Sequence, residues 1–135
     1  MRARLAQREA ALALVALLAG VVSLAITISG RAHSDHLPAP VGSYSALAAS
    51  SGTRVFGRHT ACGEVLRRGT EGVAHPVLPC GVRVYVSYRG KTVLTQVIDR
   101  GPYVPGREFD LTAALANRLG LVGVQTIHWS YAQAE

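Results

Sequence analysis

Four side chains after residue 50 are candidates for proton transfer: Glu64, His75, Asp99 and Asp110. Asp99 is the strongest candidate for a general acid and base, because it ends an apolar stretch at Val97 and Ile98 and precedes a tight Gly-Pro turn. A partly desolvated carboxylate at such a place can hold a proton and deliver it to a leaving group. The same carboxylate can take up a proton in a second step, while Glu64 and His75 orient it or stabilise charge.

Each of the four side chains also has a purely structural explanation. Asp99 could accept backbone N–H groups in an Asx-type turn, and Asp110 stands where a helix N-cap is expected. Glu64 alone would be a solvated surface acid, and His75, next to Pro76, could be a packed loop histidine. Only their occurrence together favours a shared cleft.

The remaining histidines do not indicate a metal site. His33 and His36 are three residues apart without other ligands nearby, and such isolated pairs are usually solvated. His59 and His128 match no metal or catalytic motif, so we assign them a structural role. The sequence therefore predicts neither a metal nor another cofactor.

Residues 11–30 form an apolar run without a single charge, preceded by Arg2, Arg4 and Arg8. Basic residues before an apolar segment are typical of an export signal, and this run has the length of a bilayer span of ~30 Å. Because no clean A-x-A cleavage box follows, we expect either a signal peptide or, slightly favoured, an uncleaved signal anchor within residues 1–30. The rest of the chain would then lie outside the cytoplasmic membrane.

Two further segments follow the apolar run. Residues 31–50 are rich in Ala, Ser and Pro without clear periodicity, which predicts a flexible linker. From residue 51 to residue 135, frequent Gly and Pro separate short Val-rich runs, as is typical of an all-β domain. This domain is mildly basic but has no Lys/Arg-rich run with interleaved aromatics, so we do not expect it to bind nucleic acid.

Within this domain the pattern predicts three clear strands and one helix. Apolar and polar residues alternate over 82–88, a turn follows, and 92–98 returns as the partner strand. The last strand is expected over 124–131. Leucines recur at helical spacing from Leu111 to Leu119, and Gly120 is placed to end that helix. Short strands with one short helix before the final strand indicate a small closed barrel.

The two cysteines, Cys62 and Cys80, both fall in the exported part. In an oxidising compartment, such a pair in a small domain is expected to form a disulfide, which would add roughly 3 kcal/mol of stability. The alternatives are two free buried thiols or a zinc site, but zinc would need more ligands at suitable spacing.

Three segments together resemble a known family: TACGE at 60–64, VAHPVLPCGVRV at 73–84 and VIDRGPYVPGREFDLT at 97–112. They are similar to the RlpA-like (rare lipoprotein A) domain, whose relatives include lytic transglycosylases, expansins and barwin-type domains. The resemblance implies a mainly β fold, a six-stranded double-psi β-barrel with one short helix.

The resemblance also implies a catalytic set. In lytic transglycosylase members, the motif positions matching Glu64, His75 and Asp99 carry the chemistry. Cleaving a glycosidic bond needs a proton delivered to the leaving oxygen as an oxocarbenium-like centre develops. In the lytic reaction no water attacks, because the muramyl 6-hydroxyl closes a 1,6-anhydro ring after losing its proton to the acid's conjugate base.

Further positions are expected to contact substrate. In expansin-like members the carboxylate matching Asp110 is important, and Arg100 and Tyr103 lie near the same turn, where Tyr103 could stack on a sugar ring. Many relatives carry an aromatic run before the TACG motif, whereas the only aromatic residue within positions 50–57 here is Phe56. We therefore expect a reduced sugar-stacking surface.

Two functions from different classes follow from the resemblance. The first is a lytic transglycosylase that cleaves the MurNAc-GlcNAc bond of peptidoglycan to a 1,6-anhydro product. The alternative is a non-catalytic, expansin-like module that binds the glycan in the same groove, and a domain that only binds a protein partner is a third possibility. The expected partners are peptidoglycan strands and, through residues 1–30 if they stay uncleaved, the membrane; we expect a monomer.

Overall fold

The computed structural model describes residues 37–134. The expected signal segment and the first part of the expected linker lie outside the described residues. Between residues 37 and 134, no helix has the length and apolar character needed to cross a membrane.

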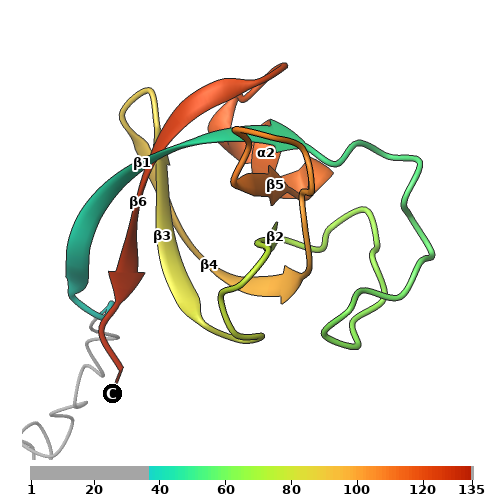
Figure 1. The fold of residues 1–135 in the computed structure, drawn as a ribbon, viewed down its shortest axis with the longest axis horizontal. Coiled ribbons are helices and arrows are strands. Elements are labelled where there is room, and N and C mark those ends of the chain that lie inside the picture. The colour runs from blue at the N-terminus through green and yellow to red at the C-terminus, as the bar shows by residue number, and fades with distance from the viewer. Residues whose placement is uncertain (1–36, 135) are drawn as a thin grey trace, which may run out of the picture. The chain divides into compact units, whose positions relative to one another are not determined.

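Six strands close into a barrel in the order β1-β5-β2-β4-β3-β6 (Figure 1). The pairs β1/β5 and β2/β4 are parallel and the other four pairs are antiparallel. The elements are β1 (Pro40–Ser50), β2 (Val73–Ala74), β3 (Arg83–Tyr88), β4 (Lys91–Asp99), β5 (Phe109–Leu111), α2 (Ala113–Leu119) and β6 (Gln125–Ala132). The predicted mainly β barrel with one short helix is confirmed.

The expected linker is wrong over its last part, because Pro40–Ser50 forms β1 and pairs with both β5 and β6. The barrel therefore begins at Pro40 and not at residue 51. Ala46 and Ala48 of this strand are buried, so the strand presents small side chains to the interior. Because Ala is depleted in strands, the Ala-rich composition of this segment indicated a linker and not a strand.

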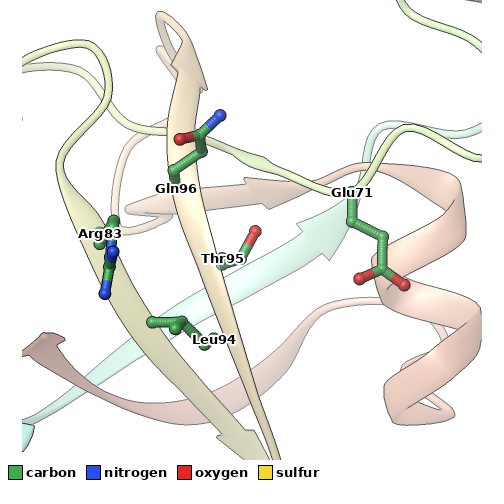
Figure 2. Close-up of a pocket in the computed structure, with 5 residues that line it drawn as sticks. All are labelled: Glu71, Arg83, Leu94, Thr95 and Gln96. Atoms are coloured by element: carbon green, nitrogen blue, oxygen red, sulfur yellow. The ribbon is translucent and has the colours of Figure 1, made fainter. Parts of the chain in front are cut away.

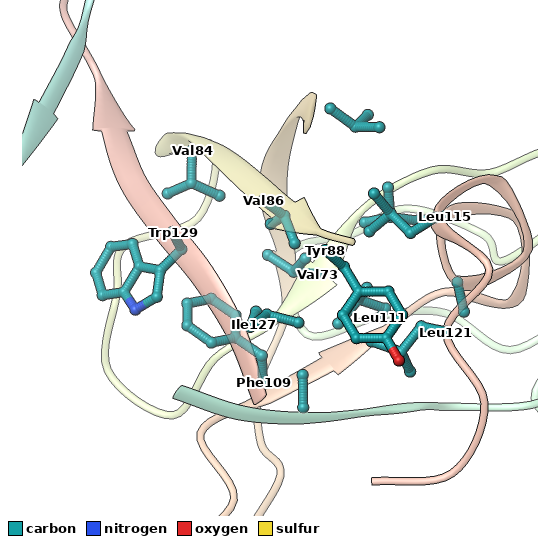
Figure 3. Close-up of a cluster of buried hydrophobic side chains, with 14 of the residues drawn as sticks. Val73, Val84, Val86, Tyr88, Phe109, Leu111, Leu115, Leu121, Ile127 and Trp129 are labelled. Carbon is teal, nitrogen blue, oxygen red and sulfur yellow. The ribbon is translucent and has the colours of Figure 1, made fainter. Parts of the chain in front are cut away.

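Alternating side chains from several strands fill the barrel (Figure 3). Val84 and Val86 of β3 are fully buried, as are Phe109 and Leu111 of β5, and Ile127 of β6 lies among them. Trp129 closes the same cluster at 7% exposure. Burying large aliphatic and aromatic side chains contributes about 1.5–3 kcal/mol each, so this interior fixes the strands that carry the site.

The helix α2 begins and ends at capping residues. Thr112 is its N-cap, and its hydroxyl accepts a hydrogen bond from the N–H of Leu115. Asp110 is therefore not the cap; it lies within β5. Gly120 ends the helix in the left-handed conformation with φ 73°, as its position in the sequence predicted.

A long loop between β1 and β2, residues 51–72, is tied to the barrel by the predicted disulfide. Cys62 and Cys80 are joined with an S–S distance of 2.02 Å, and their α carbons are 5.6 Å apart. The loop also folds on itself through a bridge between His59 and Val65. In Figure 1 this green segment extends from the side of the barrel where β2 and β5 lie.

Candidate active-site groove

The short strand β2 brings two carboxylates to one place. Its Ala74 pairs with Asp99 of β4 on one side and with Asp110 of β5 on the other. Neighbouring strands lie about 4.8 Å apart, so the α carbons of Asp99 and Asp110 are separated by roughly 10 Å. Both residues line a cavity of about 180 Å³.

Two local features turn these carboxylates toward the same cavity. In β5, Phe109 and Leu111 point into the barrel, so the intervening Asp110 points outward. In β4, the pairing with β2 shifts register because Ile98 is an extra residue between Val97 and Asp99. A β-bulge of this kind redirects the following side chain, and here that side chain is Asp99.

Asp99 also anchors the loop beside it. Its Oδ1 accepts hydrogen bonds from the backbone N–H of Ala61 and of Arg100, both at 2.8 Å. The bond to Arg100 is the local turn contact expected of an Asp at this position. Across residues 37–134, both protein donors to this carboxylate bind Oδ1, so Oδ2 has no protein donor.

Asp110 is held by Arg107 three residues earlier, with Nε 3.0 Å from Oδ1. The two atoms form an ion pair, but the contact is not aligned as a hydrogen bond, since neither atom has a well-directed partner. Burial raises the pKa of Asp110 above its ordinary 3.8, and the charge of Arg107 only partly offsets that rise. The Asp110 carboxylate is therefore easier to protonate than a free carboxylate.

The side chains of Arg100 and Tyr103, which follow Asp99 in the chain, lie in different surroundings. Arg100 lines the cavity, while its guanidinium donates to the carbonyl oxygens of Leu78 (2.5 Å) and His75 (3.4 Å) and so holds the segment before Cys80. Tyr103 is 79% exposed. A phenol ring this open can meet a ligand without rearrangement of the fold.

His75 does not line this cavity. It is buried at 4% exposure and its ring packs against Phe109 at a centroid distance of 4.8 Å. Nδ1 accepts from the backbone N–H of Val77 and Leu78 at 3.1 and 3.0 Å, and Nε2 lies 3.2 Å from the carboxylate of Glu108. This pattern assigns the ring proton to Nε2. His75 holds the loop that follows it.

Glu64 is also outside the cavity. Its Oε1 accepts from the Gln96 side-chain amide at 3.3 Å. Gln96 borders a separate, open hollow of about 310 Å³ over β3 and β4, where Thr95 and Glu71 lie on the other side of the strand (Figure 2). The three residues of the predicted catalytic set therefore lie in three separate places: Asp99 in the cavity, His75 buried against Phe109, and Glu64 beside Gln96.

A second cavity of about 300 Å³ adjoins the first, and the two share Val55, Leu66, Asp99 and Arg100. We call the two together the Asp99 groove. Its outer wall comes from the loop and includes Arg58 and His59. Arg58 was not among the predicted site residues and His59 was expected to be structural, although their position just before the TACGE motif was a usable signal. Residues 37–134 contain no group of three or more His, Cys, Asp or Glu side chains that could hold a metal ion.

Comparisons with known proteins match this domain to one family. A family model described as lytic transglycolase matches residues 48–131. The endolytic peptidoglycan transglycosylase RlpA of Yersinia pestis is 43% identical over 77 residues, which cover 56% of this chain and 21% of that protein. The probable endolytic peptidoglycan transglycosylase RlpA of Aquifex aeolicus is 40% identical over 73 residues, 53% of this chain and 32% of that protein.

The match to these relatives thus spans between about a fifth and a third of their length. Among solved structures, the Streptomyces papain inhibitor has a TM-score of 0.55 at 24% identity, covering 70% of this chain and 97% of that chain. That likeness concerns the fold. The family match and the barrel together show that the chain belongs to the lytic transglycolase family and carries an RlpA-like double-psi β-barrel domain.

Proposed function

We propose that the domain is a lytic transglycosylase that cleaves the MurNAc-GlcNAc bond of peptidoglycan in the Asp99 groove. The observation that carries the proposal is the placement of Asp99 and Asp110 on either side of Ala74, lining one cavity. The names of the relatives from Yersinia pestis and Aquifex aeolicus support peptidoglycan as the substrate.

Asp99 is the proposed acid and base. Its protonated carboxyl group gives the proton to the glycosidic oxygen as the bond to the muramyl C1 breaks. The muramyl 6-hydroxyl then bonds to C1 and gives its proton to the Asp99 carboxylate, which restores the acid. The hydrogen bonds to Oδ1 fix the carboxylate through these steps and leave Oδ2 without a protein donor.

Asp110 and Tyr103 are proposed to contact the sugars. The Asp110 carboxylate can accept hydrogen bonds from sugar hydroxyls, and its charge can stabilise the oxocarbenium-like centre. Arg107 keeps Asp110 in place from the groove's edge. Tyr103 exposes a ring on which a sugar can stack.

Glu64, His75 and the guanidinium of Arg100 are proposed to position the site. His75 and Arg100 fix residues 75–80, and Glu64 links the loop to β4 through Gln96. These contacts hold the loop wall of the groove and the segment that follows β2 against the barrel.

A domain acting on peptidoglycan works outside the cytoplasm, and we propose that residues 1–30 export or anchor it there. The disulfide between Cys62 and Cys80 supports an oxidising compartment.

The alternative is glycan binding without cleavage. It is favoured by the structural role of Asp99, whose Oδ1 already anchors Ala61 and the following turn. An Asp99 that serves only as an anchor would leave a groove that binds sugars and does no chemistry.

Digestion of purified peptidoglycan separates the two functions. The complete chain should release 1,6-anhydromuropeptides, detected by mass spectrometry, and Asp99→Asn should not. Retention of the chain on insoluble peptidoglycan without any product would overturn the cleavage proposal and support the binding module.

A further inference from the structure

The loop that supplies the outer wall of the Asp99 groove is rich in arginine. The loop of residues 51–72 exposes Arg54, Arg58, Arg67 and Arg68. Within residues 37–134, the three ion pairs involve none of these four. Of the two acids of the loop, Glu71 pairs with Arg118, and Glu64 keeps its charge beside the neutral Gln96 amide. The four arginines therefore leave the loop with a net positive charge.

Arg58 is the arginine of this group that lines the cavity with Asp99, and His59 lies beside it. Its backbone is fixed by hydrogen bonds to Val55 and Leu66, at 3.1 and 2.9 Å. A cation on a fixed backbone beside a proposed acid suits an anionic group on the substrate, and a guanidinium can bind a carboxylate through two N–H groups.

We propose that Arg58 forms a carboxylate subsite, which makes the groove select acidic muramyl glycans over neutral ones; this rests on the proposed function. Every muramyl residue carries a lactyl group at C3. Its carboxylate is free in strands stripped of peptide, whereas in peptide-bearing strands the carboxylates belong to the stem. Both sources offer the same chemistry to Arg58.

Binding to three soluble oligosaccharides of equal length tests this subsite: stripped glycan, peptide-bearing glycan and the neutral N-acetylglucosamine oligomer. The complete chain would carry Asp99→Asn to stop turnover, because Asn Oδ1 can still accept both backbone N–H groups. Adding Arg58→Gln should weaken binding to an acidic glycan about five- to tenfold at low salt, and less at high salt. Binding to the neutral oligomer should not change.

Arg58→Lys keeps the charge but loses the two-point guanidinium contact, so it should recover only part of the affinity. Arg89→Gln is the matched control, since Arg89 is an exposed arginine on the turn between β3 and β4, against Tyr88. Loss confined to stripped strands would identify the lactyl carboxylate, and loss confined to peptide-bearing strands would identify the stem.

An equal loss on the neutral oligomer, or no loss on either acidic glycan, would overturn the subsite. Product release by the native chain is measured separately. Arg58-dependent binding without products would overturn the cleavage proposal and support the subsite. Product release by a chain whose glycan binding does not depend on Arg58 would support cleavage and overturn the subsite.

Discussion

Two regions that carry polar residues of the family motifs, the Asp99 groove and the buried surroundings of His75, have different roles. Asp99 and Asp110 face the groove over β2. His75 is buried, and both of its ring nitrogens form hydrogen bonds: Nδ1 with the N–H groups of Val77 and Leu78, and Nε2 with Glu108. Polar residues of the motifs thus differ in whether a side-chain atom faces the groove, as in Asp99, or is fully engaged in holding a loop, as in His75.

The two regions should respond differently to substitution. Changing a groove residue should alter the reaction with little effect on folding, because its functional side faces the cavity. Changing a loop-holding residue should lower stability, because buried donors or acceptors lose their partners. Four variants test this contrast.

The largest effect is expected from Asp99→Asn. Loss of the general acid should slow anhydro-product release by about 10²- to 10⁴-fold. The unfolding free energy should change by less than about 1 kcal/mol, since Asn Oδ1 preserves both backbone hydrogen bonds. Asp99→Ala is the control, because it removes the anchor as well. A rate within tenfold of the native rate would place the chemistry elsewhere.

Replacing both cysteines, Cys62→Ser with Cys80→Ser, should lower the unfolding free energy by roughly 3 kcal/mol. The bridge closes a segment whose ends are 18 residues apart and ties the groove wall to the barrel. Denaturant unfolding measures the loss, with the reduced native chain as a control. An unchanged midpoint would show that the other loop contacts suffice.

His75→Ala should cost about 2 to 3 kcal/mol, because it leaves the N–H groups of Val77 and Leu78 without their acceptor. Product release per folded molecule, corrected with the unfolding curve, should stay within a few-fold of native. If the folded variant instead lost activity as severely as Asp99→Asn, His75 would belong to the chemistry and the contrast between the two regions would fail.

Asp110→Asn should give the smallest change in stability. Because burial raises the pKa of Asp110 above 3.8, the folded chain binds its proton more tightly than the unfolded chain. Asp110 therefore favours folding at low pH, and that contribution is lost as the pH rises through the folded pKa. Asn removes this dependence, so the variant should gain relative to native as the pH rises, by less than about 1 kcal/mol because solvent screens the group. A gain on acidification would contradict the sign.

Much of the fold could be predicted because its strands follow simple patterns. Val84 and Val86 alternate with polar residues, and Gly120 ends the helix where a left-handed residue is needed. The strand β1 could not be recognised, because its buried positions Ala46 and Ala48 are small. Its pairing with β5 and β6 stabilises it, and such long-range contacts are absent from local propensity.

The strand positions of the candidate site residues could be predicted, but the directions of their side chains could not. The motif spacing placed Asp99 at a strand end, but the bulge at Ile98 that turns it outward depends on pairing with β2. His75 follows Ala74, which lies between the two carboxylates, yet its ring packs on Phe109. The direction of each side chain depends on which residues of neighbouring strands and loops form contacts and hydrogen bonds with it. The sequence pattern does not contain that information.

The most direct measurement is a crystal structure of Asp99→Asn with a muramyl glycan oligomer bound. We expect the scissile oxygen within hydrogen-bonding distance of residue 99, with Asp110 across the sugar and the glycan lying over β2. A glycan bound instead over the Gln96 hollow, with the Asp99 groove empty, would contradict it.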